Sequence, residues 1–135
     1  MSNSQFENEA CVFTFTLAYM DMVLWTEKDT EGNDLEDNFG VDAFCTEARE
    51  LIEEECEEFC DSWGHLFDGE ETSAGQHFWM TRQAVANPFV EIKKWDKEYK
   101  DYLGNKTHIG RTLDKAASSY KEVEVCEFEG TISYL

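Results

Sequence analysis

The stretch from Glu47 to Asp61 reads Glu-Ala-Arg-Glu-Leu-Ile-Glu-Glu-Glu-Cys-Glu-Glu-Phe-Cys-Asp. Apolar residues in and around it recur at the three- and four-residue spacing of an amphipathic helix: Phe44, Ala48, Leu51, Ile52, Phe59 and Trp63. The acidic residues fall largely on the other side: Glu50, Glu53, Glu54, Glu57, Glu58 and Asp61. We therefore predict a helix over 47–61, capped by Thr46 and terminated at Gly64.

Four pairs of like charges stand four residues apart on the acidic side of this helix: Glu50/Glu54, Glu53/Glu57, Glu54/Glu58 and Glu57/Asp61. Each pair costs about 0.2–0.5 kcal/mol of helix stability. Stability alone therefore does not favour the pattern. The commoner interpretation of such a face is that it keeps a protein soluble, and a binding role is the alternative.

The net charge of −19 is confined to one half of the chain. Residues 1–75 contain 21 acidic and two basic side chains, whereas residues 76–135 contain nine of each. Such a field repels nucleic acid and anionic membranes and attracts basic surfaces. We expect a basic protein partner, and neither direct nucleic-acid binding nor membrane binding.

Length and composition are typical of one folded domain over residues 1–135, with a flexible polar start over 1–10. The start of the chain has no basic, apolar pattern of a signal peptide, and no stretch approaches the roughly 20 apolar residues of a membrane span. Five cysteines at irregular spacing favour reduced thiols in a cytosol.

The apolar run over 11–26 has an ambiguous period: its first residues, 12–16, could begin a strand, whereas the spacing from Leu17 to Leu24 suits a helix. We favour a helix over about 13–26, followed by a turn-rich loop over 27–38. Of the six acidic residues in this loop, the five after Glu27 are candidate partner-binding residues: Asp29, Glu31, Asp34, Glu36 and Asp37. Calcium is one interpretation, because Asp29, Glu31, Asn33 and Asp34 have a spacing that could supply oxygen ligands. The EF-hand order is absent, because Gly32 stands at the wrong offset, so a solvated loop is the commoner interpretation.

In residues 76–135 the spacing of apolar residues changes from that of a helix to that of strands. Residues 76–83 are rich in aromatic and β-favouring types and residues 89–92 alternate, which predicts a hairpin across 84–88. A helix is expected over 107–120, and residues 123–128 and 131–135 predict a second hairpin around Glu129-Gly130. The order of elements indicates an α+β fold, with a small antiparallel sheet of about four strands in two hairpins packed against two or three helices.

Catalytic and metal sites are weakly indicated. Cys56 and Cys60, with His65 and His77, allow a zinc site to be drawn, but a Cys-x-x-x-Cys pair within one helix lacks the knuckle that presents two thiolates to an ion. Buried cysteines packing in the helix seam are the commoner interpretation. No nucleophile and base stand at a recognisable spacing and no phosphate-binding loop is present, so we predict no enzyme, no metal and no cofactor.

The run Gly75-Gln-His-Phe-Trp-Met-Thr-Arg82 resembles a motif, roughly G-H-D-F-W-L-T-R-N-G-H-G, of a family of short uncharacterised tailed-bacteriophage proteins. Leu24-Trp-Thr-Glu27 and Leu35-Glu-Asp-Asn-Phe-Gly40 are similar to the family's L-W-S-E and L-D-D-N-Y-G, so the resemblance covers residues 18–134. The chain departs from the motif at residues 83–86, where Gln-Ala-Val-Ala replaces N-G-H-G. No functional residue carries over, because the family has no established activity.

The resemblance implies a phage protein acting in the cytoplasm of a bacterial host. Small acidic phage proteins often inhibit host nucleic-acid-handling or defence proteins, including restriction and CRISPR systems, and some imitate DNA. We therefore expect an inhibitor that presents the helix acids and the loop acids named above to a basic host protein. The alternative is a structural or regulatory phage protein whose acids only solubilise it, and which binds through the neutral half. Edge pairing of that half into a homodimer is a further expectation.

Overall fold

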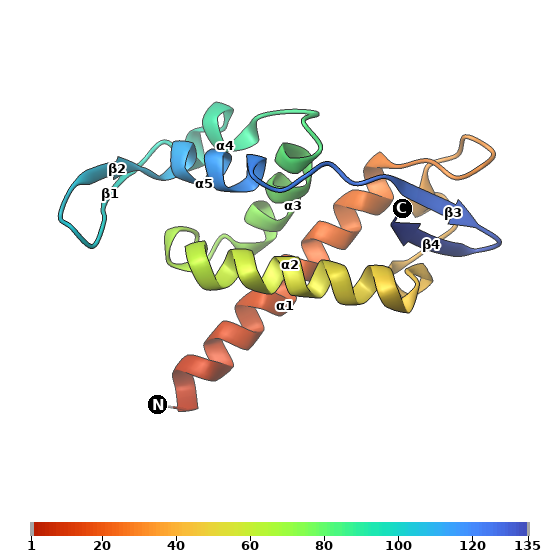
Figure 1. Cartoon of the computed structure of the whole chain (residues 1–135), viewed down its shortest axis with the longest axis horizontal. Helices are drawn as coiled ribbons and strands as arrows, with labels where there is room; N and C mark the ends of the chain where they lie inside the picture. The colour runs from red at the N-terminus through yellow and green to blue at the C-terminus, as the bar shows by residue number, and fades with distance from the viewer. Residues whose placement is uncertain (1, 135) are drawn as a thin grey trace. The chain divides into compact units, whose positions relative to one another are not determined.

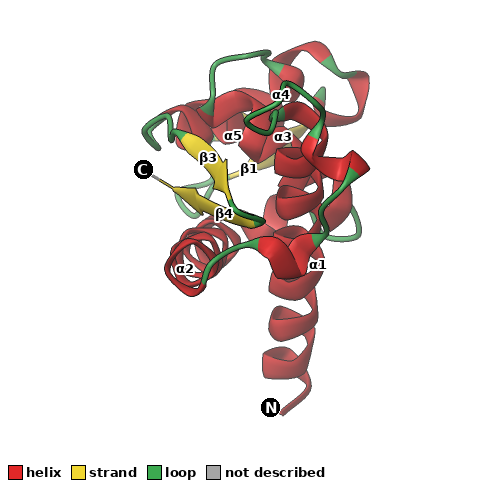
Figure 2. Cartoon of the chain, turned by 90° about the vertical axis from the view of Figure 1, so that its right-hand side faces the viewer, coloured by secondary structure: helices red, strands yellow, loops and turns green. Residues whose placement is uncertain are grey.

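The computed structural model describes residues 2–134, and its contacts divide the chain into two compact units. Unit 1 comprises residues 1–76 and 123–135, and unit 2 comprises residues 77–122. The described residues form five α-helices and two separate two-stranded antiparallel sheets (Figures 1 and 2), which confirms the predicted α+β class with four strands in two hairpins.

Two helices form the frame of unit 1. Helix α1 (Ser2–Thr26) starts earlier than the predicted residue 13, and helix α2 (Thr46–Trp63) crosses it (Figure 1). Their contact is an aromatic cluster, in which the Phe15 ring lies 5.6 Å from the Phe59 ring and 5.4 Å from the Phe67 ring, centroid to centroid. All three side chains are fully buried, so this cluster is the centre of the core of unit 1.

Helix α2 confirms the predicted helix over 47–61, with corrections at its start and on one face. Cys45, not Thr46, is the N-cap residue, and its sulfur accepts a hydrogen bond from the Ala48 amide. Gly64 is the C-cap, as predicted. Leu51 was placed in the apolar stripe but is 42% exposed, because a rotation of about 100° per residue brings it beside Glu54 and Glu58.

The predicted C-terminal hairpin is confirmed as β3 (Val125–Phe128) and β4 (Thr131–Tyr134). Its two-residue turn, Glu129-Gly130, has positive φ at both positions, which matches the twist of the strands. Ile132 of β4 bridges to Phe44, and its carbonyl accepts a hydrogen bond from the Cys45 amide at 2.8 Å. The hairpin therefore lies against the start of α2, which is seen almost end-on in Figure 2.

The predicted hairpin over 76–92 is wrong. Residues 71–82 form helix α3 (Glu71–Arg82), and residues 88–91 form the short helix α4 (Pro88–Glu91) with proline at its first position. Helix α3 is buried on most sides, so its apolar residues do not mark one face and the helical period is hidden. Packing overrides the β propensity of the aromatic run.

The other hairpin of the fold lies in unit 2 at residues 98–108, where no strand was predicted. Strands β1 (Glu98–Lys100) and β2 (Lys106–His108) pair in antiparallel register. Their five-residue connection is organised by Asp101, whose carboxylate accepts hydrogen bonds from the Leu103 and Asn105 amides, each at 2.9 Å. The Gly-Asn pair at 104–105 is the sequence feature that marks this turn.

Helix α5 (Ile109–Ser118) confirms the helix expected over 107–120. His108 caps it, since its Nδ1 accepts a hydrogen bond from the Arg111 amide at 3.1 Å while its Nε2 is 2.9 Å from Asp96 Oδ1. The helix packs closely on α4, because a Cβ placed on Gly110 would lie 2.2 Å from the Phe89 carbonyl oxygen. No helix among the described residues is long and apolar enough to cross a membrane.

The charge separates more sharply between the two units than between the two halves of the sequence. Unit 1 contains 24 acidic and two basic side chains, a net charge of −22. Unit 2 contains six acidic and nine basic side chains, a net charge of +3. The difference arises because the acidic C-terminal hairpin packs in unit 1. Two expectations stay predictions: that the chain forms one domain with a flexible start, and that it forms a homodimer.

Candidate functional site

The exposed face of α2 brings together all six helix acids of the predicted site. Each carboxylate is solvent-exposed, and the helix rotation places the six within an arc of roughly 140°. They line a shallow surface together with Ser62: Glu50, Glu53, Glu54, Glu57, Glu58 and Asp61. We call these six residues the acidic face.

The density of charge on the acidic face resembles that of one nucleic-acid strand. From Glu50 to Asp61 the helix rises about 16 Å, so the six carboxylates are spaced by about 3 Å along the axis. One strand of B-DNA carries a phosphate about every 3.4 Å, and the full duplex about every 1.7 Å. The helix alone therefore matches a single strand, and falls short of a duplex.

None of the five predicted loop acids lines the shallow surface that the acidic face forms. Two of them organise their own loop: Asp29 accepts hydrogen bonds from the Glu31 and Asn33 amides, each at 2.9 Å, and Asp34 forms an ion pair with Lys28. Glu36 lies in another hollow, beside Trp25 and Asp21. The loop acids add to the field of unit 1, but Asp29 and Asp34 also have structural roles.

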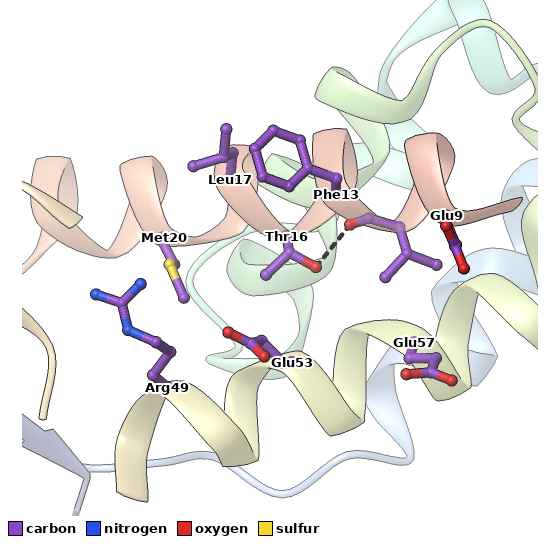
Figure 3. Close-up of a pocket in the computed structure, with 9 residues that line it drawn as sticks. Glu9, Phe13, Thr16, Leu17, Met20, Arg49, Glu53 and Glu57 are labelled. Carbon is purple, nitrogen blue, oxygen red and sulfur yellow. Dashed lines mark hydrogen bonds between the residues drawn. The ribbon is translucent and has the colours of Figure 1, made fainter. Parts of the chain in front are cut away.

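A groove runs between α1 and α2 along one edge of the acidic face (Figure 3). Its volume is about 420 Å³, and α1 contributes Thr16 and the four apolar residues of the lining: Val12, Phe13, Leu17 and Met20. Helix α2 contributes Arg49, Glu53 and Glu57, and Glu9 of α1 completes the set. The groove thus joins an apolar wall to two carboxylates of the acidic face.

Two contacts hold the groove in shape. Thr16 turns its hydroxyl back onto its own helix and donates to the Val12 carbonyl at 2.7 Å (Figure 3). Arg49 donates from Nη2 to the Val41 carbonyl at 2.7 Å, which ties the first turns of α2 to the preceding segment. The groove is therefore built from two packed helices rather than from a loop.

The groove residues of α1 were not predicted as a site. Phe13 is 66% exposed and Leu17 is half-buried, although Phe15 between them is fully buried. The sequence feature that marks them is an excess of apolar residues, since Val12, Phe13, Phe15 and Leu17 occupy more of the helix circumference than one buried stripe requires.

The cysteines of α2 pack in its buried seam, which confirms the interpretation preferred from sequence. Cys56 and Cys60 are buried, and burial raises the pKa of the Cys60 thiol well above its usual range. A thiol held neutral in this way packs like a small apolar side chain. Among the described residues, no group of three or more His, Cys, Asp or Glu side chains is arranged to hold a metal ion.

His77 belongs to the core of unit 2. Its Nδ1 accepts a hydrogen bond from the Trp95 indole at 2.9 Å, and its ring packs edge-on against Phe89. Burial, and to a lesser extent the charge of Lys94, lowers the pKa of His77 to about 4. The imidazole is therefore neutral at pH 7 and acts as a buried acceptor.

The residues of the F-W-x-T-R run are also architectural. Arg82 is buried between the Phe78 and Tyr120 rings, with its guanidinium carbon 5.8 and 5.5 Å from their centroids. It donates from Nε and Nη2 to the Lys121 carbonyl at 3.1 and 2.7 Å. These contacts stabilise unit 2 and leave the acidic face as the candidate site.

Comparison with protein-family models, with curated proteins and with solved structures gives no match for this chain.

Proposed function

We propose that this chain is a non-enzymatic phage inhibitor that binds a basic, nucleic-acid-binding host protein in the bacterial cytoplasm through the acidic face of α2. The observation that carries the proposal is six exposed carboxylates on one helix, at the axial charge spacing of a nucleic-acid strand. Glu31, Glu36 and Asp37 extend the negative field from the loop, and all three are exposed. Defence proteins of the restriction and CRISPR type are the target class.

The physical basis of the proposal is competition for a basic groove. A protein that binds nucleic acid presents lysines and arginines to phosphates, and a fixed row of carboxylates satisfies the same cations. The field of a unit with a net charge of −22 also steers association with such a surface. Affinity is therefore expected to fall steeply as salt concentration rises.

The test replaces Glu53, Glu54, Glu57 and Glu58 with glutamine and measures capture of heparin-retained proteins from a bacterial lysate. We expect the four-glutamine variant to capture at least tenfold less protein than the unmodified chain. We also expect duplex DNA to release the proteins that the unmodified chain has captured. The matched control replaces four exposed acids outside the acidic face with glutamine: Glu91, Glu98, Glu122 and Glu124. Equal capture by both variants, or no competition by DNA, would contradict the proposal.

A second candidate function rests on the β1–β2 hairpin of unit 2. Tyr102 is 95% exposed and Leu103 is 68% exposed, on a connection that the Asp101 hydrogen bonds hold in shape. Five exposed lysines precede or form this hairpin: Lys93, Lys94, Lys97, Lys100 and Lys106. The arrangement suits an acidic protein surface, as in a regulatory or structural phage protein whose own acids only solubilise it.

The two functions are separated by the response of one bound partner. An interaction that survives the four glutamine substitutions, but is lost when Tyr102 and Leu103 are both replaced by serine, would support the second candidate. An interaction with the opposite responses would support the first. Both serine positions are exposed, so the fold is expected to tolerate the change.

A further inference from the structure

The groove between α1 and α2 has features that a purely electrostatic DNA mimic does not need. Phe13 remains two-thirds exposed, and Val12 and Leu17 are half-buried, so α1 gives the groove an apolar side that solvent reaches. Phe13 and Leu17 lie on the rim of the groove opposite to Glu53 and Glu57 (Figure 3). A phosphate backbone offers no apolar wall. The groove therefore calls for a ligand that has an apolar side as well as positive charge.

The charges of the groove are arranged along its length. Glu53 projects from α2 toward α1, and Glu57 follows it along α2 (Figure 3). Glu9 lies at one end of the groove, and Arg49 lies toward the other. Three carboxylates against one guanidinium give an excess of negative charge. A ligand with two or three cations beside an apolar stripe complements this arrangement, with an acidic group or a helix C-terminus facing Arg49.

The dimensions of the groove suit a helix. Arg49 and Glu57 are eight residues apart on α2, which is about 12 Å along the helix axis. Two turns of a third helix cover that distance, with apolar anchors at i, i+3 or i+4, and i+7.

We propose that the α1–α2 groove binds a basic amphipathic helix of the partner protein, with its apolar stripe on Phe13 and Leu17 and its cations on Glu53 and Glu57. This inference rests on the proposed function, and it names the part of the partner that the edge of the acidic face recognises. The remaining carboxylates of the acidic face then contact the basic surface around that helix.

The test uses two synthetic 14-residue peptides of leucine and lysine with identical composition. In one, leucines stand at helical spacing on a single face, and in the other they are distributed around the helix. Fluorescence anisotropy of each labelled peptide is measured with the full chain at 50 and 300 mM NaCl. We expect the amphipathic peptide to bind at least tenfold more tightly, and to retain more of its affinity at 300 mM NaCl than the other peptide does.

Three variants locate the binding. Replacing Phe13 with serine is expected to weaken the amphipathic peptide at least tenfold, and Glu53→Gln with Glu57→Gln to weaken it by a similar factor. The matched control, Glu54→Gln with Glu58→Gln, removes the same charge from the part of the acidic face that does not line the groove, and is expected to change affinity less than threefold. Circular dichroism verifies that each variant is folded.

Each contrary result has a defined meaning. Equal affinity for the two peptides, or no effect of Phe13→Ser, would overturn the groove inference and leave the acidic-face function standing if the capture experiment supports it. If the four-glutamine variant loses capture but the unmodified chain binds neither peptide, the groove inference is likewise overturned and the acidic-face function stands. A Phe13-dependent dimer in sedimentation that excludes the peptide would assign the groove to a second copy of the chain instead.

Discussion

Gly75 lies where α3 approaches α1, and a Cβ at this position would lie 2.2 Å from the Phe15 carbonyl oxygen. Only glycine permits that approach. His77 and Arg82, from the same run of sequence, are held by the Trp95 indole and by the Lys121 carbonyl respectively. The run that resembles the phage family is therefore explained by close packing and buried hydrogen bonds, and its residues give no direct indication of a binding role.

Buried His77 provides a pH-dependent prediction. Its pKa is lowered from 6.5 to about 4 in the folded chain, so below pH 6.5 the unfolded chain takes up a proton that the folded chain does not. The associated stability is fully present above pH 6.5 and is lost as pH falls toward 4. We expect protonation of His77 to contribute a loss of up to about 3 kcal/mol in the free energy of unfolding, measured by urea denaturation followed by fluorescence as the difference from a variant without this histidine.

The control for this prediction is His77→Gln. Glutamine keeps an acceptor for the Trp95 indole but does not titrate, so the difference between the two proteins isolates the histidine. The variant is expected to lose less stability between pH 6.5 and 4 than the unmodified chain. Parallel pH profiles would show that His77 is not the responsible group.

At the scale of the element, α2 combines a well-packed buried stripe with a destabilising exposed one. Ala48, Ile52, Cys56 and Phe59 are buried, whereas the acidic face contains four like-charge pairs at i, i+4. A helix selected only for stability would alternate the signs of its exposed charges. The uniform sign is the feature that favours a binding role.

Two substitutions relieve all four repulsive pairs, because Glu54 and Glu57 each take part in two of them. We expect Glu54→Gln with Glu57→Gln to raise the free energy of unfolding by about 1 kcal/mol, since glutamine has a helix propensity close to that of glutamate. The same variant is expected to weaken partner binding. This variant is therefore expected to be more stable in urea denaturation and to capture less partner protein than the unmodified chain.

The matched control for α2 is Glu31→Gln with Glu36→Gln, which removes two exposed loop charges outside any helical like-charge pair. Its stability is expected to stay within about 0.5 kcal/mol of the unmodified chain. If both variants gain equally, relief of overall charge rather than of the helix pairs is the cause.

At the scale of the whole molecule, the two units differ in charge by 25 elementary charges. The net charge of −22 in unit 1 destabilises its compact state by self-repulsion, and mobile ions screen that repulsion. Unit 2, with a net charge of +3, has little self-repulsion to screen. The ionic strength of the solution is thus expected to act mainly on unit 1.

Salt is therefore predicted to stabilise the chain. Raising NaCl from 10 mM to 0.1 M shortens the screening length from about 30 Å to about 10 Å, and we expect a gain of about 1 kcal/mol in the free energy of unfolding. Urea is the appropriate denaturant, because guanidinium is itself a salt. A sucrose control matched in osmolality separates screening from solute exclusion, and a gain no larger than that control would refute the prediction.

The sequence by itself determined the elements that have one solvated face. Helix α2 and helix α5 were predicted, because a half-buried helix displays its period as recurring apolar and polar residues, and the C-terminal hairpin was predicted from its Glu129-Gly130 turn. The positions of the six helix acids and the burial of Cys56 and Cys60 followed from the same period. The α+β class followed from the order of these elements.

The tertiary structure decided what depends on contacts between distant segments. Helix α3 is buried on most sides, so its period is hidden and local β propensity suggested a strand. The pairing of Ile132 with Phe44 places the C-terminal hairpin in the acidic unit, although the two residues are 88 positions apart. The groove exists only because α1 and α2 cross, which brings Phe13 and Glu53 into the lining of one groove. Local periodicity records which residues are buried, and does not record which distant segment covers them.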